Sequence, residues 1–254
     1  MNMRNTRRRA SAFAVCGAIL ISLTASYNAA AAYESSPEMK KAKEMELKHY
    51  NDKKELNLHE TVMAALRSVP RDYFVPKDKQ AQTYQEINVP IGYGQTITNM
   101  WFVGHMTDLL NVKPGDKVLE IGSGSGYQAS VLYQITQNIF SIEIVDPLAK
   151  QAQARWKALG FTKIQGKSAD GYYGWQENAP FDKIVVTCGA DHVPTFLLQQ
   201  LKPGGTMVIP VGNPFDKQTL LLITKKEDGK ITTQRLNSCK FVPFTGKMLE
   251  KYRK

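Results

Sequence analysis

Short apolar segments alternate with amphipathic ones from residue 117 onward, and this alternation restricts the fold more than any other feature of the chain. Helices are expected at residues 125–136, 147–159 and 193–201. Strands are expected at residues 117–121, 139–144, 162–165, 182–187, 206–211, 219–224 and 231–236. Strands separated by helices need crossover connections, which predicts an α/β fold with a mostly parallel sheet. The last two strands, joined by residues 226–229 (KEDG), predict a C-terminal antiparallel hairpin.

A helical extension is expected ahead of this domain. Ser36 followed by Pro37 is typical of a helix start, and the helix should run to Tyr50. Asn57 with Glu60 resembles a capping box for a second helix, ending near Arg67. The sequence therefore predicts an N-terminal helical extension over residues 33–76 and an α/β domain over residues 77–254.

The first 32 residues have the pattern of a secretory signal peptide. Arginines 4 and 7–9 precede an apolar run over residues 10–23, and residues 30–32 are alanines. The apolar run is short for a membrane span. We therefore expect residues 1–32 to be removed on export, which favours a periplasmic location without stable membrane insertion.

Charge and cysteine content exclude several classes of function. The formal net charge of +10 falls to +6 without residues 1–32, which hold four arginines and no acids. No arginine-rich stripe with interleaved aromatic residues is present, so nucleic acid is not an expected partner. Cys188 lies in an apolar strand pattern and should be a buried thiol. No histidine or cysteine pair has metal-ligand spacing, so no metal is expected.

The turn after the first strand of the α/β domain is rich in glycine. Residues 120–126 read EIGSGSG, and such a turn lies at the carboxyl end of a parallel sheet, where ligands bind. Glycines let the backbone approach a ligand closely. Glu143 ends the next strand, 17 residues after Gly126, where a carboxylate can accept hydrogen bonds from both hydroxyls of a ribose.

Two ligands and a plain structural turn compete to explain this pattern. A dinucleotide prefers the spacing G-x-G-x-x-G, with its pyrophosphate at the helix N-terminus. This chain has G-x-G-x-G preceded by Glu120, whose negative charge disfavours a pyrophosphate. The acid suits a cationic ligand such as S-adenosylmethionine, which carries a sulfonium and an ammonium group.

A second glycine-loosened segment precedes a helix-like apolar run. Residues 89–106 read VPIGYGQTITNMWFVGHM. One interpretation is a simple turn in which a threonine caps the following helix. The other is a loop whose hydroxyl groups contribute to a functional site.

Several stretches resemble the protein-L-isoaspartate O-methyltransferase family, which has the Rossmann-like class I methyltransferase fold. The resemblance runs from about Leu58 to Gly246 and depends on six stretches. They are residues 69–76 (VPRDYFVP), 90–98 (PIGYGQTIT), 118–127 (VLEIGSGSGY), 169–171 (ADG), 201–205 (LKPGG) and 241–246 (FVPFTG). The glycine motif is shared by many methyltransferases, whereas GYGQTI and VPRDYFVP are far more particular.

The resemblance implies methyl transfer from S-adenosylmethionine to the α-carboxyl group of L-isoaspartyl residues in damaged proteins. Thr98 would be the catalytic hydroxyl, Glu143 would bind the ribose, and Asp170 would bind the adenine amino group. The full set of expected cofactor-binding residues is Gln95, Thr96, Ile97, Glu120, Gly122, Ser123, Gly124, Gly126, Glu143, Asp170 and Gly171. The expected partners are isoaspartyl-containing proteins or peptides, and the expected state is a monomer.

The chain departs from the family pattern on the substrate side of the motif. Thr98 stands where the family usually has serine, and the proline that usually follows is absent from Thr98-Asn99-Met100. Two alternatives are therefore kept: a methyltransferase of the same fold with another carboxylate or hydroxyl substrate, and a non-catalytic protein that uses the pocket for binding. Glu120, Glu143 and Asp170 argue against the second.

Overall fold

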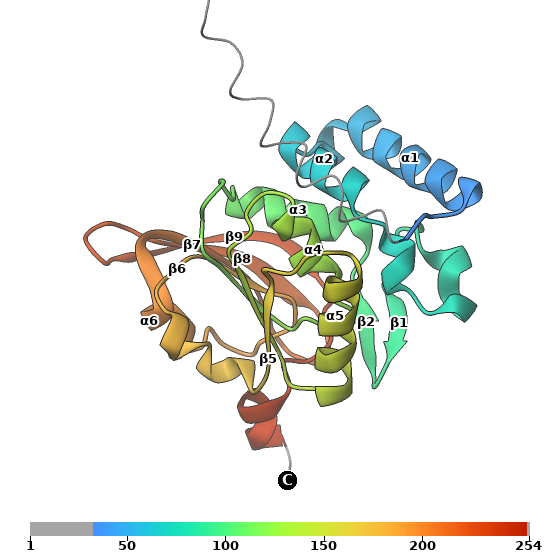
Figure 1. The fold of residues 1–254 in the computed structure, drawn as a ribbon. Helices are drawn as coiled ribbons and strands as arrows, with labels where there is room; N and C mark the ends of the chain where they lie inside the picture. The colour runs from blue at the N-terminus through green and yellow to red at the C-terminus, as the bar shows by residue number, and fades with distance from the viewer. Residues whose placement is uncertain (1–32, 253–254) are drawn as a thin grey trace, which may run out of the picture.

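A seven-stranded sheet forms the centre of the molecule, which a computed structural model describes over residues 33–252. The expected signal peptide, residues 1–32, lies outside the described residues. The strand order is β5-β4-β3-β6-β7-β8-β9, and Figure 1 labels β5 to β9 of this sheet. The strands are β3 (Val118–Ile121), β4 (Ile139–Glu143), β5 (Gln165–Ser168), β6 (Phe181–Val186), β7 (Leu201–Gly212), β8 (Gln218–Lys225) and β9 (Ile231–Cys239).

The pairing within this sheet confirms the predicted fold class. All pairs from β5 to β7 are parallel, whereas β7 with β8 and β8 with β9 are antiparallel. One expected strand was misplaced, because residues 162–165 were predicted where β5 is Gln165–Ser168. Ile164 is buried ahead of the strand, while the strand itself is polar and lies at the sheet edge. Apolar patterning cannot reveal a strand of that kind.

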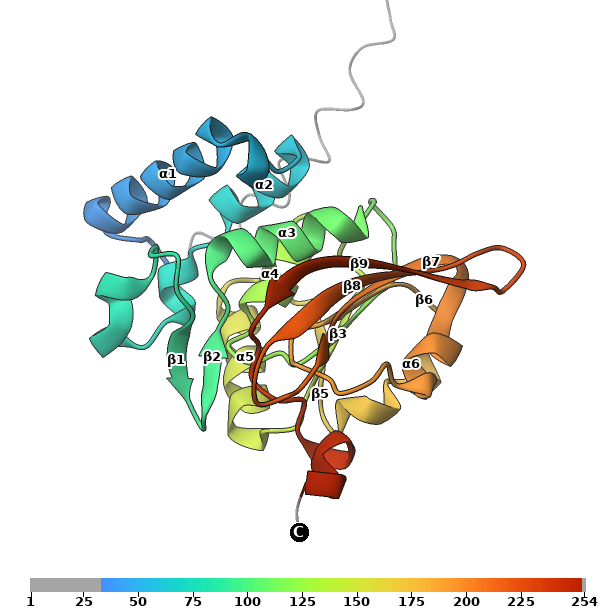
Figure 2. The same cartoon turned by 180° about the vertical axis from the view of Figure 1, so that it is seen from behind.

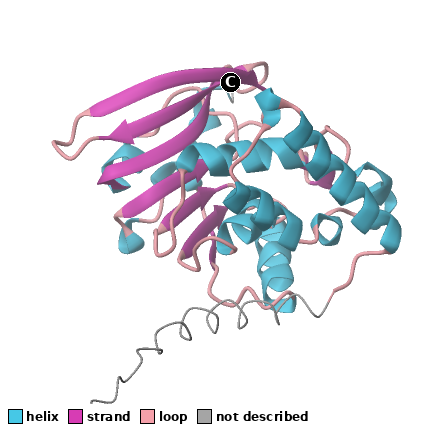
Figure 3. Cartoon of the chain, turned by 90° about the horizontal axis from the view of Figure 1, so that it is seen from above, coloured by secondary structure: helices cyan, strands magenta, loops and turns pink. Residues whose placement is uncertain are grey.

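Helices cover both faces of the sheet, as Figure 3 shows. The helices of the domain are α3 (Met100–Leu110), α4 (Tyr127–Tyr133), α5 (Asp146–Ala158) and α6 (Thr195–Gln200). Side chains alternate along β3: Val118 packs in the core formed with α3, α4 and α5, and Leu119 packs in the core that includes Leu197 of α6. The result is a three-layer arrangement with two hydrophobic cores.

The N-terminal helices are α1 (Pro37–Asp52) and α2 (Glu60–Ser68). The Ser36 hydroxyl accepts a hydrogen bond from the Met39 N–H, as expected for a helix cap. The capping box predicted at Asn57 was wrong, because α2 begins after His59 with no side-chain cap. Asn57 instead follows a short 3₁₀ turn, and the Asp108 carboxylate accepts the His59 N–H. No helix within residues 33–252 is long and apolar enough to cross a membrane.

Residues 89–97, expected to be a loop, form a separate two-stranded hairpin. Its strands are β1 (Val89–Gly92) and β2 (Gln95–Ile97), and it leads directly into α3 (Figure 2). Short 3₁₀ helices complete the described chain. They are η2 (Lys54–Leu56), η3 (Arg71–Phe74), η4 (Lys77–Gln82), η5 (Gly171–Tyr173), η6 (Gln176–Asn178) and η7 (Gly246–Tyr252). Cys188 is a buried free thiol, as predicted, and so is Cys239.

Candidate active site

The glycine turn between β3 and α4 forms the floor of the candidate site. Gly122, Gly124 and Gly126 have φ angles of +98°, +50° and +90°, a region that other residues rarely adopt. A Cβ atom at Gly126 would lie 2.7 Å from the Trp156 Nε1 atom. Backbone conformation and crowding therefore both require glycine here.

Glu143 at the end of β4 is held in place by the backbone of this turn. Its Oε2 atom accepts a hydrogen bond from the Gly124 N–H at 2.8 Å, and its Oε1 atom accepts one from the Val145 N–H at 2.9 Å. The side chain is buried but lines the cleft. Because each carboxylate oxygen has more than one lone pair, both can still accept a hydrogen bond from a ligand.

The hairpin β1–β2 and the residues after it form a second wall. Residues 95–98 line the cleft, and Ile97 is the buried member of this segment. Helix α3 is capped by Asn99, whose side-chain oxygen accepts a hydrogen bond from the Phe102 N–H at 2.9 Å. Thr98 is therefore not the helix cap, which removes the purely structural interpretation of its hydroxyl group. Within residues 33–252 no hydrogen bond of the Thr98 hydroxyl is found.

A C-terminal strap, defined as residues 241–246, closes the cleft from the other side. Gly189 holds its middle, since the Gly189 N–H donates to the Val242 carbonyl at 2.8 Å and the Phe244 N–H donates to the Gly189 carbonyl at 2.9 Å. Gln218 holds its start by accepting the Phe241 N–H at 2.8 Å. These bonds fix residues 242–245 as a wall of the cleft.

Together these segments enclose a cleft of about 770 Å³, part of it open to solvent. Nine of the residues predicted from the sequence line it. They are Gln95, Thr96, Ile97, Thr98, Gly122, Ser123, Gly124, Glu143 and Gly171. Segments far apart in the chain thus meet at the carboxyl edge of β3 and β4.

Three other predicted residues lie outside this lining. Gly126 is at the start of α4, where it accommodates Trp156. Asp170 connects two loops, because its carboxylate accepts hydrogen bonds from the Tyr172 N–H at 2.9 Å and the Lys247 N–H at 2.7 Å. Asp170 therefore joins the turn at Gly171 to the segment that follows the strap.

Glu120, the third of these residues, is fully buried beneath the glycine turn. The Ser141 hydroxyl donates to its Oε2 atom, and its Oε1 atom has no hydrogen-bond partner. Burial raises the pKa of Glu120 to about 8; the Ser141 hydrogen bond opposes the rise, and the Glu143 carboxylate adds to it. The structure thus separates Glu120 from direct contact with the cleft.

A further group of lining residues was not predicted from the sequence. They are Val103, Met106, Ile121, Tyr127, Gln128, Ile142, Ile144, Thr187, Cys188, Val242, Pro243, Phe244 and Thr245. The motif FVPFTG at residues 241–246 could have indicated the strap, since it is one of the stretches behind the family resemblance. Thr187 had no such indication, although its hydroxyl donates to the Gly122 carbonyl at 2.6 Å and supports the turn.

The residues present fit S-adenosylmethionine. Glycines leave backbone exposed along the floor, Glu143 offers fixed acceptors for ribose hydroxyls, and Ile144 and Phe244 offer apolar surface for a flat base. No cluster of three or more histidine, cysteine or acidic side chains within the described residues could hold a metal ion.

A parallel sheet extended by an antiparallel pair, with a glycine turn and an acidic residue at the ends of adjacent strands, defines the class I S-adenosylmethionine-dependent methyltransferases. Comparison with known sequences identifies the family within this class. Residues 42–249 match the family model for protein-L-isoaspartate(D-aspartate) O-methyltransferase. The chain belongs to that family.

Curated relatives agree with this assignment. Protein-L-isoaspartate O-methyltransferase 1 of Cupriavidus necator is 52% identical over 186 residues, covering 73% of this chain and 72% of the relative. Protein-L-isoaspartate O-methyltransferase 2 of a Polaromonas species is 49% identical over 189 residues, covering 74% and 90%.

Two solved structures share the fold at 24% identity. A protein-L-isoaspartate O-methyltransferase has a TM-score of 0.72, covering 83% of this chain and 69% of that one. A Plasmodium falciparum protein, described as a putative protein-L-isoaspartate O-methyltransferase in complex with S-adenosyl-L-homocysteine, has a TM-score of 0.70, covering 80% of this chain and 98% of that one.

Proposed function

We propose that the protein is a protein-L-isoaspartate O-methyltransferase that repairs damaged proteins. It transfers a methyl group from S-adenosylmethionine to the α-carboxyl group of L-isoaspartyl residues. The observation that carries the proposal is that Thr98, with a free hydroxyl, lines the same cleft as Glu143 in a chain of this family. S-adenosylmethionine supplies an electrophilic methyl group on a sulfonium.

The cofactor side of the site would be formed by the glycine turn and Glu143. The carboxylate of Glu143 would accept hydrogen bonds from the ribose hydroxyls, and it is already oriented by the Gly124 and Val145 N–H groups. Gln95, Thr96 and Ile97 cover the cofactor from the hairpin. Asp170 holds the turn at Gly171, because its carboxylate accepts the Tyr172 N–H. The carboxylate retains lone pairs that would accept a hydrogen bond from the adenine amino group.

The substrate side would be formed by Thr98. A substrate carboxyl group is already ionised at neutral pH, so the reaction needs no general base. The Thr98 hydroxyl donates a hydrogen bond to one carboxylate oxygen and so directs the other toward the methyl group. The rate then comes from positioning and from the exclusion of water in the cleft.

Methylation of matched peptides tests this function. The protein without residues 1–32 is incubated with labelled S-adenosylmethionine and an isoaspartyl peptide or its normal aspartyl twin. We expect label on the isoaspartyl peptide alone, as a base-labile ester. Cofactor binding with label on neither peptide would indicate another carboxylate or hydroxyl substrate, and absence of cofactor binding would leave a non-catalytic binding protein.

We also propose that residues 1–32 direct export to the periplasm and are removed there. The basic start, the short apolar run and the alanines before Tyr33 support this. The proposed mature chain is a monomer, with a helical extension to residue 76 and a methyltransferase domain over residues 77–254. Mass spectrometry of the protein from its native host should find a start near Tyr33, and a full-length cytoplasmic chain would refute export.

A further inference from the structure

A chain of hydrogen bonds joins the floor of the cleft to a buried carboxyl group. The Ser141 hydroxyl donates to Glu120, and the hydroxyl oxygens of Ser123 and Ser141 lie 2.5 Å apart. Ser123 lines the cleft, while Glu120 and Ser141 are fully buried. We call these three side chains the serine relay. It connects the ligand-facing surface to a group that no solvent or ligand reaches directly.

The ionisation of Glu120 sets the direction of the hydrogen bonds in this relay. An ionised carboxylate only accepts, so Ser141 donates to it and Ser123 donates to Ser141. Because Ser123 lines the cleft, the remaining lone pairs of its oxygen are then available to a ligand there, which favours a positively charged ligand. A protonated Glu120 can donate instead, which allows both hydroxyls to reverse and lets Ser123 present its hydrogen to the cleft.

The surroundings of Glu120 compensate its charge only in part, because burial and Glu143 raise its pKa, whereas Ser141 and the Ala129 N–H lower it. Its Oε1 atom has no hydrogen-bond partner, and the residue paired with it on β6 is the apolar Val185. From β4 it is faced by Ser141 and by the Glu143 carboxylate, and from α4 by the Ala129 N–H. Burial raises the pKa of Glu120 to about 8, so a positive charge brought into the cleft would favour loss of its proton.

We propose that the serine relay makes the cleft discriminate between the cofactor and its demethylated product by charge. S-adenosylmethionine carries a sulfonium, whereas S-adenosylhomocysteine has a neutral sulfur. With Glu120 ionised, the relay turns acceptor atoms toward the cleft and favours the sulfonium form. The relay therefore promotes release of the product after methyl transfer. This inference rests on the proposed function, because it requires that the cleft binds S-adenosylmethionine.

Calorimetric binding of both ligands between pH 6 and pH 9 tests the relay without a methylation assay. The compared proteins, each without residues 1–32, are the parent, Glu120→Gln and Ser141→Ala. For each protein we take the affinity for S-adenosylmethionine divided by the affinity for S-adenosylhomocysteine. From pH 6 to pH 9 this ratio should rise in the parent by a factor about three to ten times larger than in Glu120→Gln. The amino groups of the ligands titrate in the same range but do so equally for each protein, so the difference isolates Glu120.

Ser141→Ala keeps the carboxyl group and breaks the relay, so it should also lose most of the extra dependence on pH. Glu177→Gln is the matched control, since it removes an exposed negative charge that forms an ion pair with Lys167 at 3.7 Å. It should behave as the parent. Repeating the titration in two buffers of different ionisation enthalpy should show more proton release on cofactor binding in the parent than in Glu120→Gln.

Equal pH dependence in the parent and Glu120→Gln would overturn the inference. If Ser141→Ala kept the pH dependence of the parent, the inference would be overturned as well, because the carboxyl group would then act without the relay. If the parent binds neither ligand, it is the proposed function that fails. If Glu120→Gln does not fold, Ser141→Ala decides the matter.

Discussion

At the scale of single residues, Thr98 and Asn99 show how adjacent side chains divide two roles. The sequence allowed Thr98 to be either a helix cap or a functional hydroxyl. The cap is Asn99, which also donates its N–H to the Asn88 side-chain oxygen at 2.9 Å. Thr98 is left at the cleft with an unengaged hydroxyl, so its substitution should change catalysis and spare stability.

Thr98→Val removes the hydroxyl and preserves the shape of the side chain. We expect methyl transfer to an isoaspartyl peptide to fall about ten- to a hundredfold, equivalent to about 1.4–3 kcal/mol of transition-state stabilisation. Thr98→Ser should keep the activity. Single-turnover methylation measures the rate, and thermal melting should detect little change. A fully active valine variant would exclude Thr98 from the mechanism.

Glu143→Ala removes the proposed acceptor for the ribose. The affinity for S-adenosylmethionine should fall by about 1.5–3 kcal/mol, the scale of hydrogen bonds to a charged group. Calorimetry of the folded variant measures the loss. Glu143→Gln is the matched control, because it keeps one oxygen acceptor and should lose less. Unchanged affinity in the alanine variant would contradict the assignment.

The raised pKa of Glu120 predicts how stability depends on pH. The folded protein holds this proton more tightly than the unfolded chain, whose pKa is near 4.5. The stabilisation from this group is therefore fully present below about pH 4.5 and is lost as the pH rises through about 8. Urea unfolding should show that the parent loses about 2–4 kcal/mol relative to Glu120→Gln between pH 5 and pH 8.5. Parallel pH profiles for the two proteins would contradict the raised pKa.

At the scale of elements, the hairpin β1–β2 and helix α3 form one unit through paired asparagines. Asn88 precedes β1 and accepts the N–H of Asn99, which in turn caps α3. Asn99 has φ −55° and ψ 154°, an extended conformation compatible with this capping position. The two side chains therefore hold the backbone on the helix side of Thr98, while the pairing of Val89 with Ile97 holds it on the strand side.

Loss of the Asn99 cap should destabilise this unit. Asn99→Ala should lower the free energy of unfolding by about 1 kcal/mol, because the Phe102 N–H loses its partner. Asn99→Ser and Asn99→Asp restore an oxygen at this position and should recover most of the loss. Urea denaturation compares the three variants. Equal destabilisation by alanine and serine would show that the side-chain oxygen does not act as a cap.

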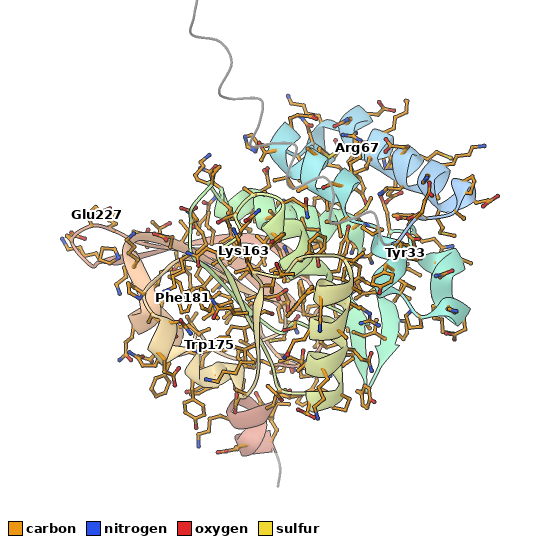
Figure 4. The ribbon with its side chains drawn as sticks, viewed as in Figure 1. Tyr33, Arg67, Lys163, Trp175, Phe181 and Glu227 are labelled. Atoms are coloured by element: carbon orange, nitrogen blue, oxygen red, sulfur yellow. The ribbon has the colours of Figure 1, made fainter. Side chains whose placement is uncertain are left out.

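At the scale of the whole molecule, Asp72 connects the start of the described chain to its body. The carboxylate accepts hydrogen bonds from the hydroxyls of Tyr33 at 2.7 Å, Ser35 at 2.8 Å and Tyr84 at 3.0 Å. Tyr33 also packs on Tyr73, with ring centroids 4.7 Å apart, and Figure 4 shows its position beside the N-terminal helices. The residues directly after the proposed cleavage point are thus part of the folded structure.

Asp72→Ala should destabilise the whole protein, because Asp72 is buried and three hydroxyl groups would lose their acceptor. We expect a loss of about 2–4 kcal/mol in the free energy of unfolding. Tyr33→Phe, which removes one donor and keeps the ring, should cost about 1 kcal/mol. Thermal unfolding followed by circular dichroism compares them. An alanine variant as stable as the parent would show that this connection contributes nothing.

Much of the candidate site could be predicted because its residues come directly at or after the ends of strands, and a strand is recognised from a few consecutive residues. The glycine turn ends β3 and Glu143 ends β4, and parallel strands place such ends at one edge. The strap and Thr187 could not be found in this way. They reach the cleft through hydrogen bonds to Gly189 and Gly122 that join segments far apart in the chain.

The sequence by itself determined the α/β fold class, the antiparallel end of the sheet and the ligand turn, because apolar periodicity and glycine content act within a few residues. Only the tertiary structure decided that Glu120 is buried away from the cleft and that Asn99, not Thr98, caps α3. It also decided that the polar segment Gln165–Ser168 is a strand. Burial and hydrogen-bond partners come from distant parts of the chain, so no local pattern encodes them.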